Sequence, residues 1–395
     1  MLGKIRFLSG CAVLFCIIFI CITLSPVYSA EKAPVTQYWM SVSTEKGGFP
    51  GMPTGPGGGL PSIGSIFGMG RGGSDSGKRL LLEVNAAKAL PADPQATHDI
   101  PPAQNMGPTL PLLPPDPGRA EEGGPGDRPE KFEKPKMRMV IYWGCSETVR
   151  PGQPYVIDTE KASPAEFGKM FQGRHASQQG LSRGQAYADW PNKKDGKPVP
   201  ANSSLAGDHF VHGNYVPDIR FAIDPGHDYM APVEFTSKKG TPADSFYFQW
   251  NPIPTATGYF ATAMGHDQKT GTMIIWSSSD VREAGWSLMN FLSNEDVRKL
   301  VKDRVVMPAS TTQCVVPKGI FKDAQGAMIQ FIAYGDELNI VYPQKPKNPV
   351  WAVKVRRKST SMLPLMEMVA GEAGSGSEKK EGMSPGKALK GLFGF

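Results

Sequence analysis

Cysteine is scarce in this chain, and its placement excludes two classes of protein. There are five cysteines in 395 residues, and three of them, Cys11, Cys16 and Cys21, lie near the amino terminus. The other two, Cys145 and Cys314, are too few for a disulfide-dense scaffold, and no CxxC pair or Cys/His cluster predicts a zinc site. The sequence leaves open whether these two pair in an oxidising compartment or remain buried free thiols.

Signatures of catalysis and of nucleic-acid binding are also missing. The chain has no GxSxG motif, and Ser277 to Ser279 end a predicted strand without a His and an Asp in a recognisable order. We interpret Cys145 as a small core residue at a strand end instead of a thiolate nucleophile. The net charge is +6, but Lys and Arg are interspersed with Asp and Glu, so no basic stripe indicates nucleic-acid binding.

One glycine-rich segment has part of a phosphate-binding motif. Gly72 to Lys78 (GGSDSGK) matches the first seven positions of a P-loop, but Arg79 stands where Ser or Thr must hold magnesium. No strand precedes the segment and no helix is predicted after it. We therefore interpret it as a linker.

The first 29 residues have the three parts of a secretory signal peptide. Lys4 and Arg6 supply the positive region, an unbroken apolar stretch runs from Cys11 to Leu24, and small residues follow. Cleavage after Ser29 is favoured because it places Val27 and Ser29 at the two positions that prefer small side chains. The predicted product is an exported soluble protein, periplasmic or secreted.

This segment has two other interpretations. An uncleaved membrane anchor is the alternative, since the apolar run from Phe7 to Leu24 approaches the roughly 20 residues that span a bilayer. A lipoprotein signal at Cys11 is excluded by order, because its apolar region must precede the cysteine and here follows it.

Glycine and proline, at 45 and 37 residues, are concentrated in a few segments. Such composition predicts linkers or disorder. We expect disordered insertions near residues 46–77 and 101–136, and a disordered or weakly amphipathic tail over 363–395. Lys387 to Phe395 (KALKGLFGF) is the part of the tail that would contact a membrane surface or a partner groove.

Between these segments the sequence predicts a mainly β protein with two β-sandwich-like units, residues 30–237 and 238–362. Short runs rich in β-branched and aromatic residues, bounded by Gly and Pro, are typical of strands. In the first unit these are residues 37–42, 79–84, 137–143, 218–223 and 229–235. The polar, proline-rich stretch over 147–217 is expected to be an ordered loop with a short helix near 165–171.

The second unit resembles a fibronectin type III domain over Ser245 to Thr360. A strand ending in Trp250, a Pro-containing turn and a Gly-Tyr at Tyr259 are similar to that family's second and third strands. The segment AMIQFIAYG over 327–335 is similar to its penultimate strand. The resemblance implies that Trp250 and Tyr259 lie on the inner faces of two sheets.

Helices near 281–302 depart from the family pattern. Val281, Ala284, Leu288, Met289 and Leu292 follow helical spacing. Asp280 with Glu283, and then Ser293 with Asp296, resemble capping boxes. We therefore expect two helices inserted into the sandwich.

One group of residue types suits a metal ion. Imidazoles and carboxylates bind zinc and other divalent ions when they converge, and the candidates are Asp208, His209, His212, Asp218, His227 and Asp228. On an extended segment, however, His209 and His212 point to opposite faces. We therefore assign no metal, cofactor or catalytic residue, and expect loop histidines satisfied by water or backbone.

The sequence favours a non-enzymatic binding or structural protein of the cell envelope or secreted space, with a protein or a glycan as possible partner. Most tryptophans lie inside strand or helix patterns and are expected to be buried. Trp190, in the polar stretch, is the candidate for an exposed platform. The alternative is a hydrolase or metal-dependent enzyme with its site between Asp208 and Asp228. Asn202-Ser203-Ser204 permits N-glycosylation only in a eukaryotic secretory route.

Overall fold

The computed structural model describes most of the chain between Val35 and Leu365. The described residues are 35–47, 76–115, 138–163, 178, 180–184, 186–241, 243–267, 269–324, 327–344 and 349–365. The predicted signal peptide, the helix near 165–171 and the tail beyond Leu365 lie outside them, as do residues 48–75, which include most of the P-loop-like segment.

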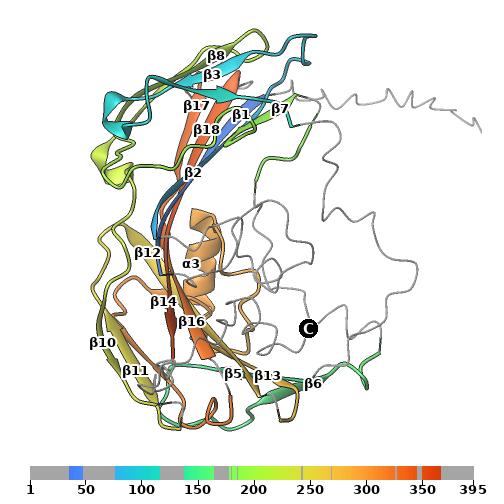
Figure 1. Ribbon diagram of the computed structural model, residues 1–395, viewed down its shortest axis with the longest axis vertical. Coiled ribbons are helices and arrows are strands. Elements are labelled where there is room, and N and C mark those ends of the chain that lie inside the picture. The colour runs from blue at the N-terminus through green and yellow to red at the C-terminus, as the bar shows by residue number, and fades with distance from the viewer. Residues whose placement is uncertain are drawn as a thin grey trace, which may run out of the picture. The chain divides into compact units, whose positions relative to one another are not determined.

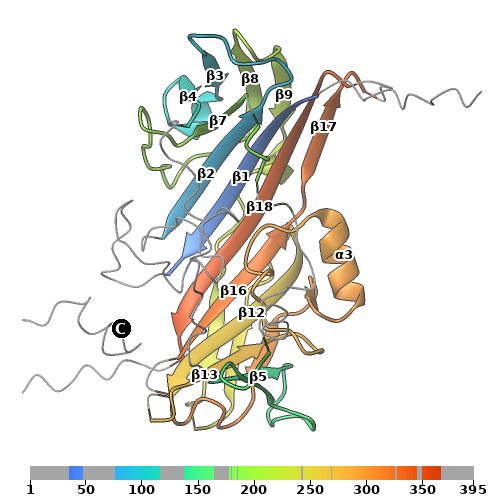
Figure 2. The same ribbon diagram turned by 90° about the vertical axis from the view of Figure 1, so that its right-hand side faces the viewer.

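The described part is mainly β, and its largest element is an 11-stranded sheet (Figure 2). In spatial order its strands are β6 (Tyr155–Asp158), β5 (Arg138–Trp143), β13 (Thr272–Ser277), β12 (Ala256–Asp267), β16 (Ala327–Gly335), β18 (Trp351–Pro364), β1 (Thr36–Lys46), β2 (Gly77–Asn85) and β7 (Tyr187–Trp190), with β14 (Met307–Pro308) beside β12 and β17 (Leu338–Tyr342) beside β18.

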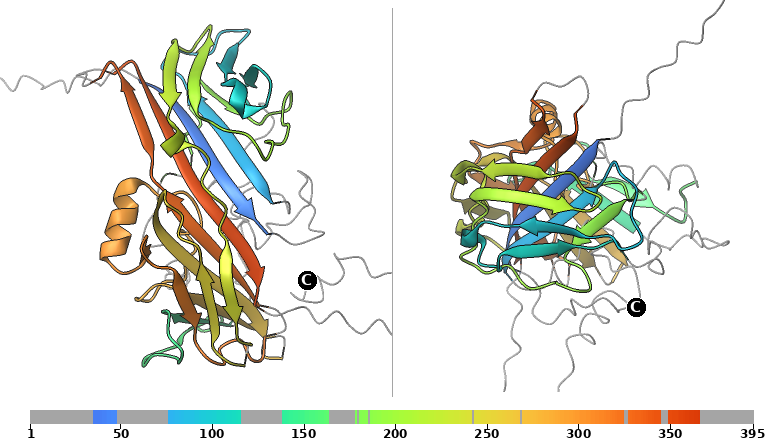
Figure 3. Two further views of the ribbon diagram at one scale, coloured as in Figure 1. Left: turned by 90° about the vertical axis from the view of Figure 1, so that its left-hand side faces the viewer. Right: turned by 90° about the horizontal axis from the view of Figure 1, so that it is seen from above.

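Two smaller sheets cover one face of the large sheet (Figures 1 and 3). One has the strand order β4 (Thr109–Leu112), β3 (Ala96–Asp99), β8 (Gly207–Gly213) and β9 (Ile219–Ile223). The other has the order β10 (Phe235–Lys239), β11 (Phe246–Trp250) and β15 (Gln313–Val316). Each packs against a different part of the large sheet, so the fold has two sandwich-like halves.

Each half has its own hydrophobic core. In the half with β10, β11 and β15, Trp250 packs 4.7 Å from Phe331 and 5.5 Å from Tyr259, measured between ring centroids. In the half with β3 and β8, buried Tyr38 and Met40 of the large sheet face Val211 of the smaller one. Burial of each such side chain contributes about 1.5–3 kcal/mol, so both halves have substantial cores.

The two halves share strands. β18 contributes Val353 and Val355 to one core and Leu363 to the other. It pairs in parallel with β1 through 11 residue pairs, from Thr36 opposite Trp351 to Lys46 opposite Ser361. The predicted ranges 30–237 and 238–362 therefore contribute strands to the same sheet, since a strand pairing across more than 300 residues leaves no local trace in the sequence.

Several sequence predictions differ from the structure in detail. Most of the stretch over 229–235 is loop, and its apolar residues Met230 and Val233 enter a core without forming a strand. Residues 101–115, predicted to be disordered, contain the 3-10 helix η1 (Pro102–Gln104) and β4, because Leu110 and Leu112 alternate into a core. The polar stretch over 147–217 contains β6, β7 and β8.

One predicted helix is present and the other is not. α3 (Asn294–Lys302) begins after Ser293, whose hydroxyl accepts a hydrogen bond from the backbone N–H of Asp296, as the capping pattern predicts. The helix predicted from Val281 is wrong. Gly285 has φ of +88°, and a Cβ at this position would lie 2.7 Å from the Phe260 ring, so a right-handed helix cannot continue through it. The apolar residues that follow Gly285 pack with α3 on the face of the large sheet opposite the two smaller sheets (Figure 1).

Cys145 and Cys314 form a disulfide. Cys145 follows β5 of the large sheet and Cys314 lies in β15 of the three-stranded sheet. The bond joins residues 169 positions apart, and a cross-link of this length restricts the unfolded chain strongly. It therefore fastens the two layers of one half to each other.

We expect replacement of both cysteines by alanine to lower the free energy of unfolding by about 2–5 kcal/mol. Urea unfolding of the oxidised protein and of the double variant measures this difference. Reductant should bring the wild-type protein down to the stability of the variant and leave the variant unchanged. Equal midpoints for oxidised and reduced wild-type protein would contradict the assignment.

Candidate functional site

The structure separates the six residues predicted as possible metal ligands. His209 is buried, His212 lies 3.2 Å from a carboxylate oxygen of Asp99, and Asp208 and Asp218 are exposed. His209 and His212 have different partners on opposite faces of β8, as the extended backbone predicts. Among the residues that the structure describes, no group of three or more His, Cys, Asp or Glu side chains is placed to hold a metal ion.

The other two have separate structural contacts. The carboxylate of Asp228 accepts hydrogen bonds from the hydroxyl of Ser204 at 2.5 Å and from the backbone N–H of Leu205 at 2.8 Å. His227 contacts Asp224 at 2.6 Å and Asp336 at 3.3 Å. The loop from Asp224 to Asp228 is thus fastened by its own polar side chains.

A buried chain of hydrogen bonds runs through one core. Tyr38 Oη lies 2.8 Å from His98 Nδ1, His98 Nε2 lies 2.9 Å from His209 Nδ1, and His209 Nε2 lies 2.7 Å from the carbonyl of Leu205. Because a carbonyl only accepts, His209 Nε2 donates, and a single tautomer of each neutral imidazole then completes the chain. Burial lowers the pKa of both histidines. The chain therefore holds two neutral histidines inside the core.

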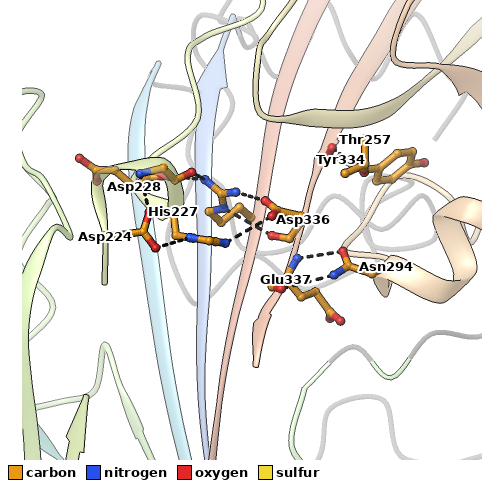
Figure 4. A network of polar contacts seen from close by, with 10 residues as sticks. Asp224, His227, Asp228, Thr257, Asn294, Tyr334, Asp336 and Glu337 are labelled. Carbon is orange, nitrogen blue, oxygen red and sulfur yellow. Dashed lines mark hydrogen bonds and ion pairs between the residues drawn. The ribbon is translucent and has the colours of Figure 1, made fainter. Parts of the chain in front are cut away.

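A second polar network lies at the junction of the two halves (Figure 4). Arg357 of β18 is buried and pairs with Asp336. Its guanidinium also donates to the carbonyls of Gly226 at 2.8 Å and Asp228 at 3.0 Å. The loop that leads from β9 to β10 is therefore bound to β18, with His227 as a second link to Asp336.

The turn at Asp336 and Glu337, which follows β16, also contacts α3 (Figure 4). The backbone N–H of Glu337 donates to the side-chain oxygen of Asn294 at 2.9 Å, and the Asn294 amide donates back to the carbonyl of Glu337 at 3.3 Å. Tyr334 of β16 donates to the carbonyl of Leu288. These bonds fix the start of α3 against the end of β16.

A bulge decides which acidic residue of this turn lies on which face of the sheet. Tyr334 pairs with Lys358, and Leu338 pairs with Val355. Residues 335–337 thus stand opposite only residues 356 and 357. An extra residue re-aims the side chains around it, so Asp336 contacts Arg357 while Glu337 contacts Lys354 at 3.5 Å.

Glu337 lines a cavity of about 170 Å³ on the α3 side of the sheet. β1 and β18 supply its floor with Trp39, Lys354 and Arg356. Its wall comes from Glu337 and from the residues at the start of α3, among them Phe291 and Asp296. No residue of the predicted 208–228 region lines it.

Cations and aromatic rings alternate along the face of β18 that supplies the cavity floor. Lys354, Arg356 and Lys358 lie at every second position of β18 and so share one face. Lys354 and Arg356 lie 4.8 and 4.6 Å from the ring of Trp39, and Arg356 and Lys358 lie 4.7 and 4.6 Å from the ring of Phe291. Such contacts with desolvated cations contribute about 1–2 kcal/mol each.

Arg356 is held in place by several partners. Two of its nitrogens donate to Ser41 Oγ, at 3.2 and 2.6 Å, and a third donates to the carbonyl of Gln178 at 2.8 Å. Burial lowers the pKa of Arg356 to about 10 and that of Lys358 to about 8. Both values lie above neutral pH, so both side chains stay charged, and its hydrogen bonds hold Arg356 in place without a ligand.

Sequence reasoning missed this site. The sequence pattern predicts a strand over Trp39 but gives no sign of a ligand site there, and the mixed charge of the chain does not distinguish the basic residues of β18. The available signal was the spacing of Lys354, Arg356 and Lys358, which lie two residues apart in WAVKVRRKST.

The remaining candidates have ordinary surroundings. Trp190 is buried, so it is no exposed platform. Cys145 is oxidised and cannot act as a thiolate. Ser277 donates to the carbonyl of Glu283 at 2.6 Å, and Lys78 donates to the carbonyl of Ser203 at 2.6 Å.

The chain matches no protein-family model, no curated protein and no solved structure. Within the described ranges, no helix has the length and apolar character needed to cross a membrane.

The histidine chain predicts a dependence of stability on pH. Unfolded histidine binds a proton below about pH 6.5, whereas the folded protein resists protonation of His98 and His209 because burial lowers their pKa. The contribution of the two histidines to the free energy of unfolding should therefore be fully present above about pH 6.5. It should fall as the pH drops toward 5, by up to about 1.4 kcal/mol per pH unit for each histidine.

Replacement of His98 by glutamine should make this slope shallower, since one of the two protons no longer contributes. Urea unfolding at several pH values measures it. His212→Gln is the matched control, because His212 lies on β8 with His209 but outside the core. A slope that His98→Gln leaves unchanged would show that the buried chain does not cause the effect.

Proposed function

We propose that this protein is an exported, non-enzymatic binding protein of the cell envelope or secreted space, and that its ligand occupies the cavity between β18 and the start of α3. The observation that carries the binding role is the preformed cation–aromatic floor. Arg356 is buried, stacked against Trp39 and Phe291, and fixed by Ser41 and Gln178. A preorganised site avoids the cost of ordering side chains when a ligand binds.

The disulfide supports export. Bonds of this kind persist in oxidising compartments and are rare in the cytosol, and Cys145 and Cys314 are joined although their sequence positions gave no sign of it. The predicted signal peptide supplies the route. The two features are independent, because one is the amino-acid composition of the predicted signal peptide and the other is a covalent bond in the folded part.

The chemistry of the cavity supports binding over catalysis. Its described lining contains one hydroxyl, that of Ser293, which is bound to Asp296. No imidazole lies among the described lining residues to activate it. The hydrolase alternative was based on the 208–228 region, and the described side chains of that region do not converge.

We keep the fibronectin type III likeness of residues 245–360 as a proposal about fold. Trp250 of β11 and Tyr259 of β12 belong to facing sheets and pack against each other, which supports it. The parallel pairing of β18 with β1 joins this range to a strand that lies outside it, since β1 spans Thr36–Lys46. A likeness of fold would not by itself specify a ligand.

For export, we expect the mature protein from its own cells to begin at Ala30, after cleavage following Ser29. Mass spectrometry of the intact protein gives its amino terminus, and thiol labelling before and after reduction reports the disulfide. A chain that still begins at Met1, or two free thiols in the folded protein, would overturn this part of the proposal.

For binding, we expect at least one class in a panel of small anions, cations, zwitterions and neutral sugars to raise the unfolding temperature of the wild-type protein. The shift should be reduced in Lys354→Gln, which alters the cavity floor. Lys302→Gln, on the exposed side of α3, is the matched control and should behave as wild type. Absence of any shift, or equal shifts in both variants, would overturn the cavity as a binding site.

A further inference from the structure

We propose that the cavity takes a small zwitterion, a molecule with one carboxylate, one ammonium group and a short apolar part. This inference rests on the proposed binding function and specifies its ligand. It is drawn from the placement of charge around the cavity, which is balanced in sign and divided between two sides.

The cationic side is the floor. Lys354 and Arg356 project from neighbouring same-face positions of β18. Arg356 is buried and immobilised, whereas the Lys354 side chain is 28% exposed and can move toward a ligand. A carboxylate at the floor would meet one fixed and one adjustable cation.

The acidic side is the wall. Glu337 comes from the bulge after β16, and its side chain is only 6% exposed. Asp296 lies in the first turn of α3, where Ser293 donates to its carboxylate at 2.8 Å. The two carboxylates come from different elements and border the same cavity, so an ammonium group there would find acceptors on two sides.

Charge balance favours a zwitterion over a simple ion. The two cations and two carboxylates of the lining cancel. A plain anion would bind beside Asp296 and Glu337, and a plain cation would bind beside Lys354 and Arg356. In each case the ion would be repelled by like charges, strongly where water is scarce. A zwitterion exchanges the Lys354 to Glu337 pair for two new pairs and leaves the net charge of the site unchanged.

Size and apolar lining limit the ligand further. A cavity of 170 Å³ has the volume of about six water molecules in the liquid, which suits a small molecule and excludes a folded partner. Trp39, Phe291 and Leu292 supply apolar surface beside the charged groups. An α-amino acid with a small aliphatic side chain has this combination of size, charge and apolar area.

The test compares ligands that share a skeleton and differ in charge. L-leucine, N-acetyl-L-leucine and L-leucinamide carry both charges, the carboxylate alone and the ammonium alone, and the same series on L-alanine covers a smaller side chain. Binding to the full wild-type protein is measured by titration calorimetry. We expect at least one free amino acid to bind, and its two blocked forms to bind at least about tenfold more weakly.

Two nearly isosteric variants assign the charges to the two sides. Lys354→Gln and Asp296→Asn should each weaken the binding of the free amino acid by at least about tenfold. Lys302→Gln should leave its affinity unchanged. The blocked ligands need only wild-type protein, so the comparison holds even if a variant fails to fold.

The outcomes separate the two proposals. Equal binding of a blocked form and its free amino acid would overturn the zwitterion and leave the cavity as a binding site for a single charge. The zwitterion also falls if neither series binds while another class in the panel still gives a shift that depends on Lys354. If no class binds at all, both proposals fall.

Discussion

The alternation of side chains along β18 is the constraint on which the rest of the structure depends. One face of this 14-residue strand carries Val353, Val355 and Leu363 into two separate cores. The other face carries Lys354, Arg356 and Lys358 beneath the rings of Trp39 and Phe291. Because successive residues of a strand point to opposite faces, the register that builds the cores also sets the spacing of the cations.

The bulge opposite β18 links those two faces. Asp336 neutralises Arg357 on the face of the cores, and Glu337, the next residue, pairs with Lys354 on the face of the cavity. If the pairing of β16 with β18 continued without the extra residue, Asp336 would lie on the face of the cavity and Glu337 on the face of the cores. The extra residue instead lets one turn bind the loop from Asp224 to Asp228, the start of α3 and the cavity wall.

Local features of the fold could be predicted from the sequence, and pairings between distant segments could not. Strands such as β1, β2, β5 and β16 followed from β-branched and aromatic runs, and the start of α3 followed from Ser293 and Asp296. The failed helix before α3 had the right apolar spacing, but Gly285 needs a left-handed backbone to fit against Phe260.

The candidate site could not be predicted from residues that are close in the sequence. His209, His212 and His227 are close along the chain but face different partners. The cavity combines Trp39 with Arg356 and Phe291, and only tertiary pairing brings them together.

The double use of β18 has a consequence for how this chain can change. Replacing one residue of the strand alters one position on one face, and its neighbours keep their places. Adding or deleting a residue would turn every later side chain to the other face, sending lysine and arginine toward the cores and valine toward the cavity. The side-chain arrangement of the strand between Trp351 and Pro364 therefore depends far more on the strand's length than on any single residue in it.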